Sequence, residues 1–161
     1  MSAYLDTIRY ELHAYKVMTE RAVAQVGDEQ LYWKPDDEAN SIAIIMQHMA
    51  GNMESRWTDF LMTDGEKDWW DRDGEFIDGH LARGKLMEVW EAGWATCLAA
   101  INGLSDDDLQ KTVTIRDEEY TVMGAIQRQL AHYAYHVGQI TWVARSLVGP
   151  GWQTLSVARN R

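Results

Sequence analysis

Two histidines four residues apart, His132 and His136, carry the strongest chemical signal in the sequence. Residues with this spacing share one face of a helix, with Cβ atoms about 5–6 Å apart, so two imidazoles can reach one ion at nitrogen–metal distances of about 2.0–2.1 Å. His48 has a similar apolar setting, one turn after Ile44 and beside Met49. Facing helices can bring three such side chains to one point. The three histidines are therefore candidate ligands of a divalent metal. The alternative reading of the spacing is that His132 and His136 are partly exposed or hydrogen-bonded core residues.

Four polar residues near these histidines are candidates for supporting roles. A metal-bound imidazole needs a hydrogen-bond acceptor at its second nitrogen, and Gln129 and Gln139 each lie three residues from one of the paired histidines. The alternative is that these glutamines cover the seam between helices. Asn52 and Arg56 follow His48 by one and two helical turns and could orient a substrate. Ordinary hydrogen bonding between helices, or a surface charge, is the alternative for these two. The sequence identifies no catalytic residue.

Four stretches of the chain have the apolar spacing of amphipathic helices. Good N-cap residues precede the second stretch, and glycine follows the first, third and fourth. Four helices and no other large element predict an all-α fold, with a four-helix bundle as the leading architecture. The stretches run from Tyr4 to Val26, from Asn40 or Ser41 to Phe60, roughly from Leu81 to Ile101, and from Thr121 to the Gly149-Pro150 pair.

One segment, Thr112 to Val122, departs from the helical pattern. Its alternation of apolar and polar residues predicts a short extended crossing or hairpin before the last helix. The three connections between helices are long for a bundle, so loop length does not force each helix to lie antiparallel to the next. Within the second connection, Asp71, Asp73 and Glu75 lack the spacing of an EF-hand calcium loop.

Length and composition are those of one globular domain over residues 1–161, with 46% hydrophobic and 25% charged residues. A net charge of -10 with no basic stripe argues against a nucleic-acid partner. No window approaches the roughly 20 apolar residues of a membrane span, and the N-terminal stretch lacks the apolar core of a signal peptide. The single cysteine, Cys97, excludes an internal disulfide. We therefore expect a cytoplasmic protein without membrane contact. Its eight tryptophans predict a core or pocket lined by large rings.

Two segments resemble the metal-binding helices of the DinB-like superfamily. The segment from Arg128 to Ile140 (RQLAHYAYHVGQI) is similar to the last helix of that superfamily. The segment from Asn40 to Asn52 (NSIAIIMQHMAGN) resembles its second helix, and YWKP before it matches the usual lead-in. The stretch from Ser55 to Phe60, followed by DGEK, resembles an uncharacterised branch related to metal-dependent hydrolases and thiol S-transferases.

This resemblance implies an up-down-down-up four-helix bundle, a metal on His48, His132 and His136, and a homodimer. Three neutral imidazoles leave one or more coordination positions for water or substrate. Imidazole suits zinc and nickel, which we expect first, as well as iron and manganese.

The relatives implied by the resemblance include S-transferases and isomerases that use bacillithiol or mycothiol. We therefore expect a metal-dependent thiol S-transferase with a small external thiol as cosubstrate, in which the metal stabilises the thiolate. A metal-dependent hydrolase is one alternative, although Tyr133 and Ala134 stand where H-E-x-x-H has its Glu and the next residue. A non-catalytic metal-binding stress-response domain is the other alternative, and a metal without access for a ligand would favour it.

Overall fold

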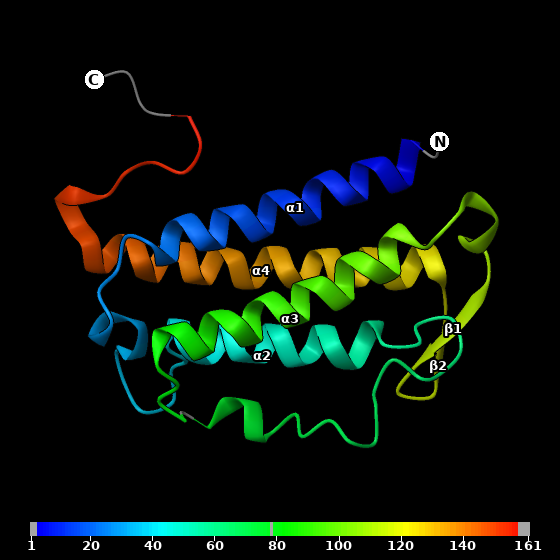
Figure 1. Cartoon of the computed structure of the whole chain (residues 1–161), viewed down its shortest axis with the longest axis horizontal. Coiled ribbons are helices and arrows are strands. Elements are labelled where there is room, and N and C mark those ends of the chain that lie inside the picture. Colours follow the sequence, from blue (N-terminus) through cyan, green and yellow to red (C-terminus); the bar gives the residue numbers. More distant parts are fainter. Residues whose placement is uncertain (1–2, 78, 158–161) are drawn as a thin grey trace.

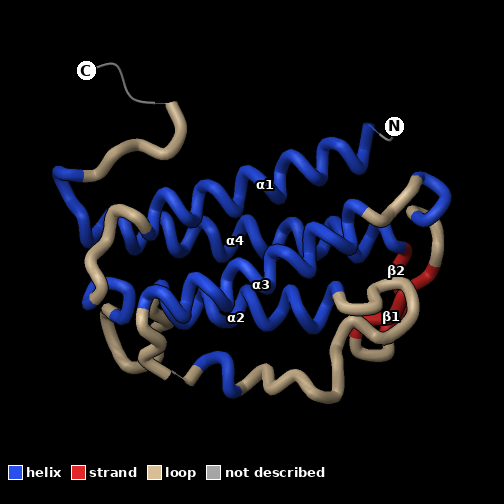
Figure 2. Tube along the Cα trace, viewed as in Figure 1, coloured by secondary structure: helices blue, strands red, loops and turns tan. Residues whose placement is uncertain are grey.

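Four long helices and one small antiparallel sheet make up the computed structural model, which describes residues 3–77 and 79–157 (Figure 1, Figure 2). Helices α1 and α4 run in one direction, and α2 and α3 run in the opposite direction (Figure 1). Helix α2 packs mainly against α3, and α1 mainly against α4. The elements are α1 (Ala3–Val23), α2 (Ile42–Trp57), α3 (Arg83–Asn102), β1 (Thr112–Ile115), β2 (Glu118–Thr121) and α4 (Val122–Val148), with short 3-10 turns at η1 (Glu29–Tyr32), η2 (Gly74–Phe76), η3 (Asp106–Asp108) and η4 (Gly149–Gly151).

The two helices that carry the candidate histidines begin at side-chain caps. The Ser41 hydroxyl accepts a hydrogen bond from the Ile44 backbone N–H at 3.2 Å, and the Thr121 hydroxyl accepts one from the Gly124 N–H at 3.0 Å. Such caps satisfy backbone donors that the first helical turn leaves unpaired. The predicted starts of these helices are therefore confirmed. Helix α4 ends as predicted before Gly149, which has a positive φ of 61°.

Two helices end earlier than the apolar spacing predicts. Helix α1 ends at Val23 and α2 at Trp57, whereas the pattern continues to Val26 and Phe60. Both of these later residues are buried, at 5% exposure each. Apolar spacing predicts which side chains lie in the core, and a residue in the turn after a helix can also lie there. The spacing therefore does not fix the last residue of a helix.

The predicted hairpin is present as β1 and β2. Val113 pairs with Tyr120, and the two-residue turn at Arg116 and Asp117 has positive φ angles of 57° and 62°. Both turn residues in the left-handed region are typical of a type I′ hairpin, whose twist matches that of the strands. The turn N–H groups of both residues donate to the Asp64 carboxylate at 3.0 Å. Asp64 thus fastens the hairpin to the loop that follows α2.

Helix α2 is the most deeply buried helix, because other elements cover it on several sides. On the α3 side, Gly93 allows the close approach: a Cβ there would lie 2.7 Å from the Cα of Ala50. The connection that contains η2 packs along α2 and covers another part of it. The predicted role of tryptophan in the core is confirmed for Trp57, Trp90 and Trp94. None of the described helices has the length and apolar character needed to cross a membrane.

The segment after Pro150 lies against the C-terminal end of α1 and the residues that follow it. Arg21 donates from its guanidinium to the Leu155 carbonyl at 2.9 Å, and the Gln25 side-chain amide donates to the Gln153 carbonyl at 3.1 Å. These bonds fix the course of the chain beyond α4 over the described residues.

Candidate metal centre

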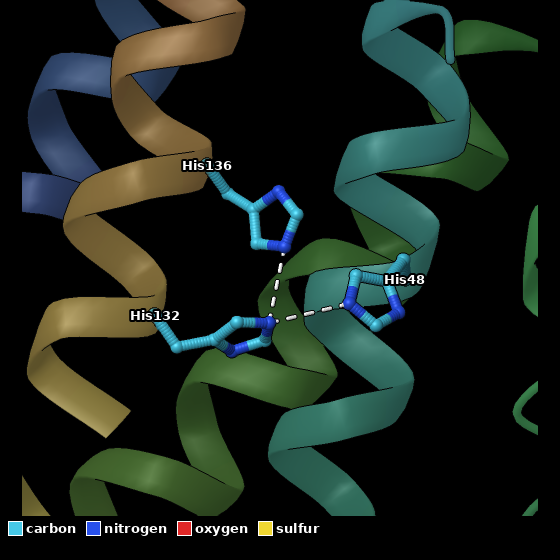
Figure 3. A group of neighbouring side chains, drawn as sticks. All are labelled: His48, His132 and His136. Atoms are coloured by element: carbon cyan, nitrogen blue, oxygen red, sulfur yellow. Dashed lines mark hydrogen bonds between the residues drawn. The ribbon is translucent and has the colours of Figure 1, made fainter. Parts of the chain in front are cut away.

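Three imidazoles from two helices converge on one point (Figure 3). The Nε2 atom of His132 lies 3.0 Å from Nε2 of His136 and 3.4 Å from Nε2 of His48. Ligand atoms of all three side chains lie within 4.8 Å of one another. A tetrahedral ion bonded at about 2.0–2.1 Å to each nitrogen needs nitrogen separations of roughly 3.3–3.4 Å. The three side chains therefore have the spacing of a metal ligand set with little adjustment. The other two histidines, His13 and His80, are exposed and lie outside this cluster.

Burial keeps two of these imidazoles neutral. Burial is the main cause that lowers the pKa of His132 to about 3, and the neighbouring His136 and His48 lower it further. Burial also lowers the pKa of His136 to about 4, although a hydrogen bond to Gln139 acts in the opposite direction. Neutral imidazole is the form that offers a nitrogen lone pair to a metal. At neutral pH both side chains are ready to bind an ion.

Two of the histidines have hydrogen-bond acceptors at the ring nitrogen that faces away from the cluster. The Nδ1 atom of His48 lies 3.0 Å from Oε2 of Glu75, and Nδ1 of His136 lies 2.8 Å from Oε1 of Gln139. A proton held on Nδ1 by an acceptor leaves the Nε2 lone pair free for a metal. The Nδ1 atom of His132 is buried and has no hydrogen-bond partner among the described residues.

Glu75 is the supporting residue that sequence reasoning missed. It is 8% exposed, and its second carboxylate oxygen accepts a hydrogen bond from Nε1 of Trp70. Gly51 provides the room for it: a Cβ at that position would lie 1.6 Å from Oε1 of Glu75. A glycine within an otherwise bulky helix was the signal available in the sequence, but it does not identify the side chain that fills the space. Phe76 follows directly and stacks on the imidazole of His48, with ring centroids 4.6 Å apart.

Gln129 does not contact any of the three histidines through a hydrogen bond described in this structure. Its amide nitrogen donates to Oδ1 of Asn52 at 2.7 Å and to the hydroxyl of Tyr133 at 3.2 Å. The Tyr133 hydroxyl also accepts a hydrogen bond from Nε1 of Trp57 at 2.9 Å. Gln129 thus ties α4 to α2 and fixes the orientation of Asn52, which lies one turn beyond His48.

A cavity of about 400 Å³ adjoins the histidine cluster. It opens beside His48 and His132, so a ligand in the cavity can reach the point on which the Nε2 atoms converge. A volume of this size suits a small molecule. The residues that line it are His48, Asn52, Arg56, Trp70, Arg72, Arg116, Arg128 and His132. The predicted positions Asn52 and Arg56 are both among them, while Arg72, Arg116 and Arg128 were not found from the sequence.

The site combines three nitrogen ligands with access from a cavity. Three histidines could bind a divalent transition-metal ion, and two of them, His48 and His132, line the cavity. A closed structural site has four protein ligands and no such access. Cys97 is fully buried in the core, and burial raises the pKa of its thiol well above the ordinary range. That thiol is therefore not a nucleophile for chemistry in the cavity.

A family model described as "Protein of unknown function (DUF1572)" matches residues 1–161, and the chain belongs to that family. A comparison with curated proteins finds no match.

Proposed function

We propose that the protein is a DinB-like metalloprotein whose four-helix bundle holds a divalent transition metal on His48, His132 and His136. The observation that carries the proposal is the convergence of three Nε2 atoms from α2 and α4. The opposite directions of the α1/α4 and α2/α3 pairs support an up-down-down-up bundle (Figure 1). The neutral state of the paired histidines on α4 and the acceptors at two Nδ1 atoms further support a metal role.

The ligand set favours zinc or nickel over iron or manganese. All three candidate ligand atoms are imidazole nitrogens, and manganese prefers oxygen ligands, while non-haem iron sites commonly include a carboxylate. The nearest buried carboxylate, Glu75, is engaged by His48 and Trp70 on the side of the imidazole away from the convergence point. It supports a ligand and is not itself placed as one.

The reaction we propose is S-transfer, in which the thiolate of a small external thiol attacks an electrophilic substrate. A bound divalent cation would lower the pKa of a thiol or a water molecule that it contacts. The cavity beside His48 and His132 gives a small molecule access to that position, and the burial of Cys97 leaves the chain without a thiol of its own for the step. Metal-dependent hydrolysis is the second candidate. It needs a general base beside the reacting water, and the engagement of Glu75 at Nδ1 of His48 disfavours it.

Elemental analysis of the untagged protein tests the metal assignment. We expect about one equivalent of zinc or nickel in the parent, loss of that metal in His136→Ala, and retention in His13→Ala, which removes an exposed histidine. A parent that stays metal-free after incubation with either ion would refute the site. Turnover that requires both metal and an added low-molecular-weight thiol would support the transferase, whereas ester hydrolysis without thiol would favour the hydrolase. A metal-loaded protein inactive in both assays would favour the non-catalytic, stress-response alternative.

Homodimer formation and a cytoplasmic location stay predictions from the sequence. Sedimentation velocity of the metal-loaded protein tests the first, and fractionation of cells that express the full chain tests the second.

A further inference from the structure

Arg56 is a buried cation that forms no ion pair with any of the residues that the structure describes. It lies in the last turn of α2 and is 1% exposed, yet its Nε and Nη1 atoms have no hydrogen-bond partner among the described residues. A buried charge normally persists only when it is paired or hydrogen-bonded, because removing it from water costs several kcal/mol. The guanidinium lines the cavity beside the histidines. Packing encloses these two nitrogens, so the charge of Arg56 is left without a counter-charge among the described residues.

The surroundings of Arg56 make its charge more costly. Burial is the main cause that lowers the pKa of Arg56 to about 10, and the like charge of Arg128 is the second. Of the acidic side chains nearby, Glu66 is already paired with Arg116. None of the described residues that line the cavity is acidic. An anion in the cavity would supply the missing opposite charge.

The backbone around Arg56 holds its side chain in place. A Cβ at Gly65 would lie 2.4 Å from Nη1 of Arg56 and 3.3 Å from its Cζ, so the loop after α2 packs directly on the guanidinium. The Gly65 N–H donates to the Thr114 carbonyl at 2.8 Å, which anchors this loop to β1. The Ser55 hydroxyl donates to the Gly65 carbonyl at 3.3 Å. The guanidinium is therefore positioned by packing, before any ligand binds.

Four arginines from four separate segments of the chain line the same cavity, and two of them have no acidic partner among the described residues. Arg116 pairs with Glu66, and Arg72 lies 3.3 Å from a carboxylate oxygen of its neighbour Asp73. Arg128 donates from Nη1 to the neutral amide oxygen of Gln129 at 3.0 Å, and none of the ion pairs among the described residues involves Arg128 or Arg56. The chain has a net charge of -10, yet the four arginines make the lining of this cavity positively charged.

We propose that the cavity binds an oxyanion of the substrate, a carboxylate or a phosphate, on Arg56 and Arg128, while the reacting group of the same molecule lies at the three histidines. Guanidinium matches the geometry of both oxyanions and binds them with paired hydrogen bonds. Asn52 also lines the cavity, and because Gln129 engages its Oδ1 atom, its amide N–H groups are the part left to contact a ligand. The anion site narrows the proposed function to anionic substrates. It rests on that proposed function only for the assignment of the reacting group to the three histidines.

Binding of simple anions to metal-free protein tests this site separately from the metal. Isothermal titration with inorganic phosphate and with succinate, at low and constant ionic strength, is compared for the parent, Arg128→Met and Arg145→Met. Arg145 is exposed on the same helix and lines no part of this cavity, so it controls for the loss of one positive charge. We expect saturable binding in the parent and in Arg145→Met, and about tenfold or greater weakening in Arg128→Met, since hydrogen bonds to charged groups are the stronger class. Tighter phosphate or tighter succinate binding identifies which oxyanion the site prefers.

Arg56→Met gives a second readout that a purely structural arginine would not give. If Arg56 is held unpaired for a ligand, its replacement by a chain of similar length should leave the thermal midpoint of the anion-free protein unchanged or higher, and abolish the stabilisation by phosphate. Absence of saturable anion binding in the parent would overturn the proposal, as would equal affinity in Arg128→Met or equal weakening in Arg145→Met. These outcomes do not depend on metal content, so the anion site and the metal site can fail independently.

Discussion

Gly51 controls whether Glu75 can reach His48, and its replacement by alanine is a sharp test of the metal centre. The added Cβ would lie 1.6 Å from Oε1 and 2.7 Å from Cδ of Glu75, and 3.3 Å from Nε1 of Trp70. The atoms it meets belong to the end of a flexible side chain, so the carboxylate moves away and α2 stays in place. His48 then loses the acceptor at Nδ1 that now lies 3.0 Å away.

Gly51→Ala has two opposing effects on the stability of the protein, but only one effect on its affinity for the metal. Alanine favours a helix interior over glycine by about 1 kcal/mol, while displacement of a buried carboxylate costs a similar amount. We therefore expect little change in the free energy of unfolding of metal-free protein. Loss of the hydrogen-bond acceptor behind a metal-bound histidine typically weakens metal binding by about 10–100-fold, which is about 1.4–2.7 kcal/mol.

Competition with a chromophoric chelator for zinc measures the affinity, and far-UV circular dichroism checks that the variant is folded. Gly138→Ala is the matched control, because a Cβ there would meet nothing within 4 Å and the same helix-propensity gain applies. Glu75→Gln should weaken zinc less than Gly51→Ala, since an amide oxygen can still accept from Nδ1 of His48. A folded Gly51→Ala protein that binds zinc as tightly as Gly138→Ala would refute the role of Glu75.

Three further predictions follow from packing and charge. In metal-free protein, the pKa values of His132 and His136 are lower than the value of about 6.5 in the unfolded chain, so the unfolded chain binds more protons below pH 6.5. The free energy of unfolding should therefore be highest above pH 6.5 and fall toward pH 4, by on the order of 2 kcal/mol in total after allowance for solvent screening. Urea unfolding that gives the same free energy at pH 6.5 and pH 4 would contradict this. Asp64→Ala removes the acceptor of three backbone N–H groups at 2.7–3.0 Å and should lower the free energy of unfolding, measured by urea titration, by about 1–2 kcal/mol. An unchanged urea midpoint would mean that the hairpin keeps its place without the Asp64 carboxylate. Gly93→Ala places a Cβ 2.7 Å from the backbone of α2 and should lower the free energy of unfolding by about 1–3 kcal/mol, although alanine has the better helix propensity. Gly84→Ala is the control, because its Cβ meets nothing within 4 Å and should not destabilise the protein. Equal thermal midpoints for the two variants would argue against the close contact between α3 and α2.

Local rules explain the parts of the structure that the sequence predicts well. The starts of α2 and α4 depend on one hydroxyl each, Ser41 and Thr121, that accepts a hydrogen bond from a residue three positions later. The relation of His132 to His136 depends on the helical repeat alone. The hairpin before α4 follows from alternation over a few residues. These features are determined by neighbours along the chain, so the chain order is enough to find them.

The supporting contacts of the site lie beyond that range. Glu75 reaches His48 from the short turn η2, 27 residues further along the chain, in a connection whose sequence has no periodic apolar pattern. Spacing gives Gln129 and Gln139 the same relation to the paired histidines, but their side chains have different contacts: Gln139 reaches His136, and Gln129 turns to Asn52. The choice between such partners depends on which helix lies opposite, and periodicity does not contain that information.

The sequence alone therefore predicted the four helices, the hairpin and the His132–His136 pair, because these follow from capping, alternation and helical spacing. The grouping of His48 with that pair rested on the family resemblance, because helical spacing does not relate residues on two different helices. Only the tertiary structure decided the character of the cavity beside them. Composition gives an acidic chain that should repel anions, yet packing brings Arg56, Arg72, Arg116 and Arg128 to one cavity. Two of them have no acidic partner among the described residues. Net charge averages over the whole surface, whereas the potential inside a cavity depends on the few side chains that the fold places around it.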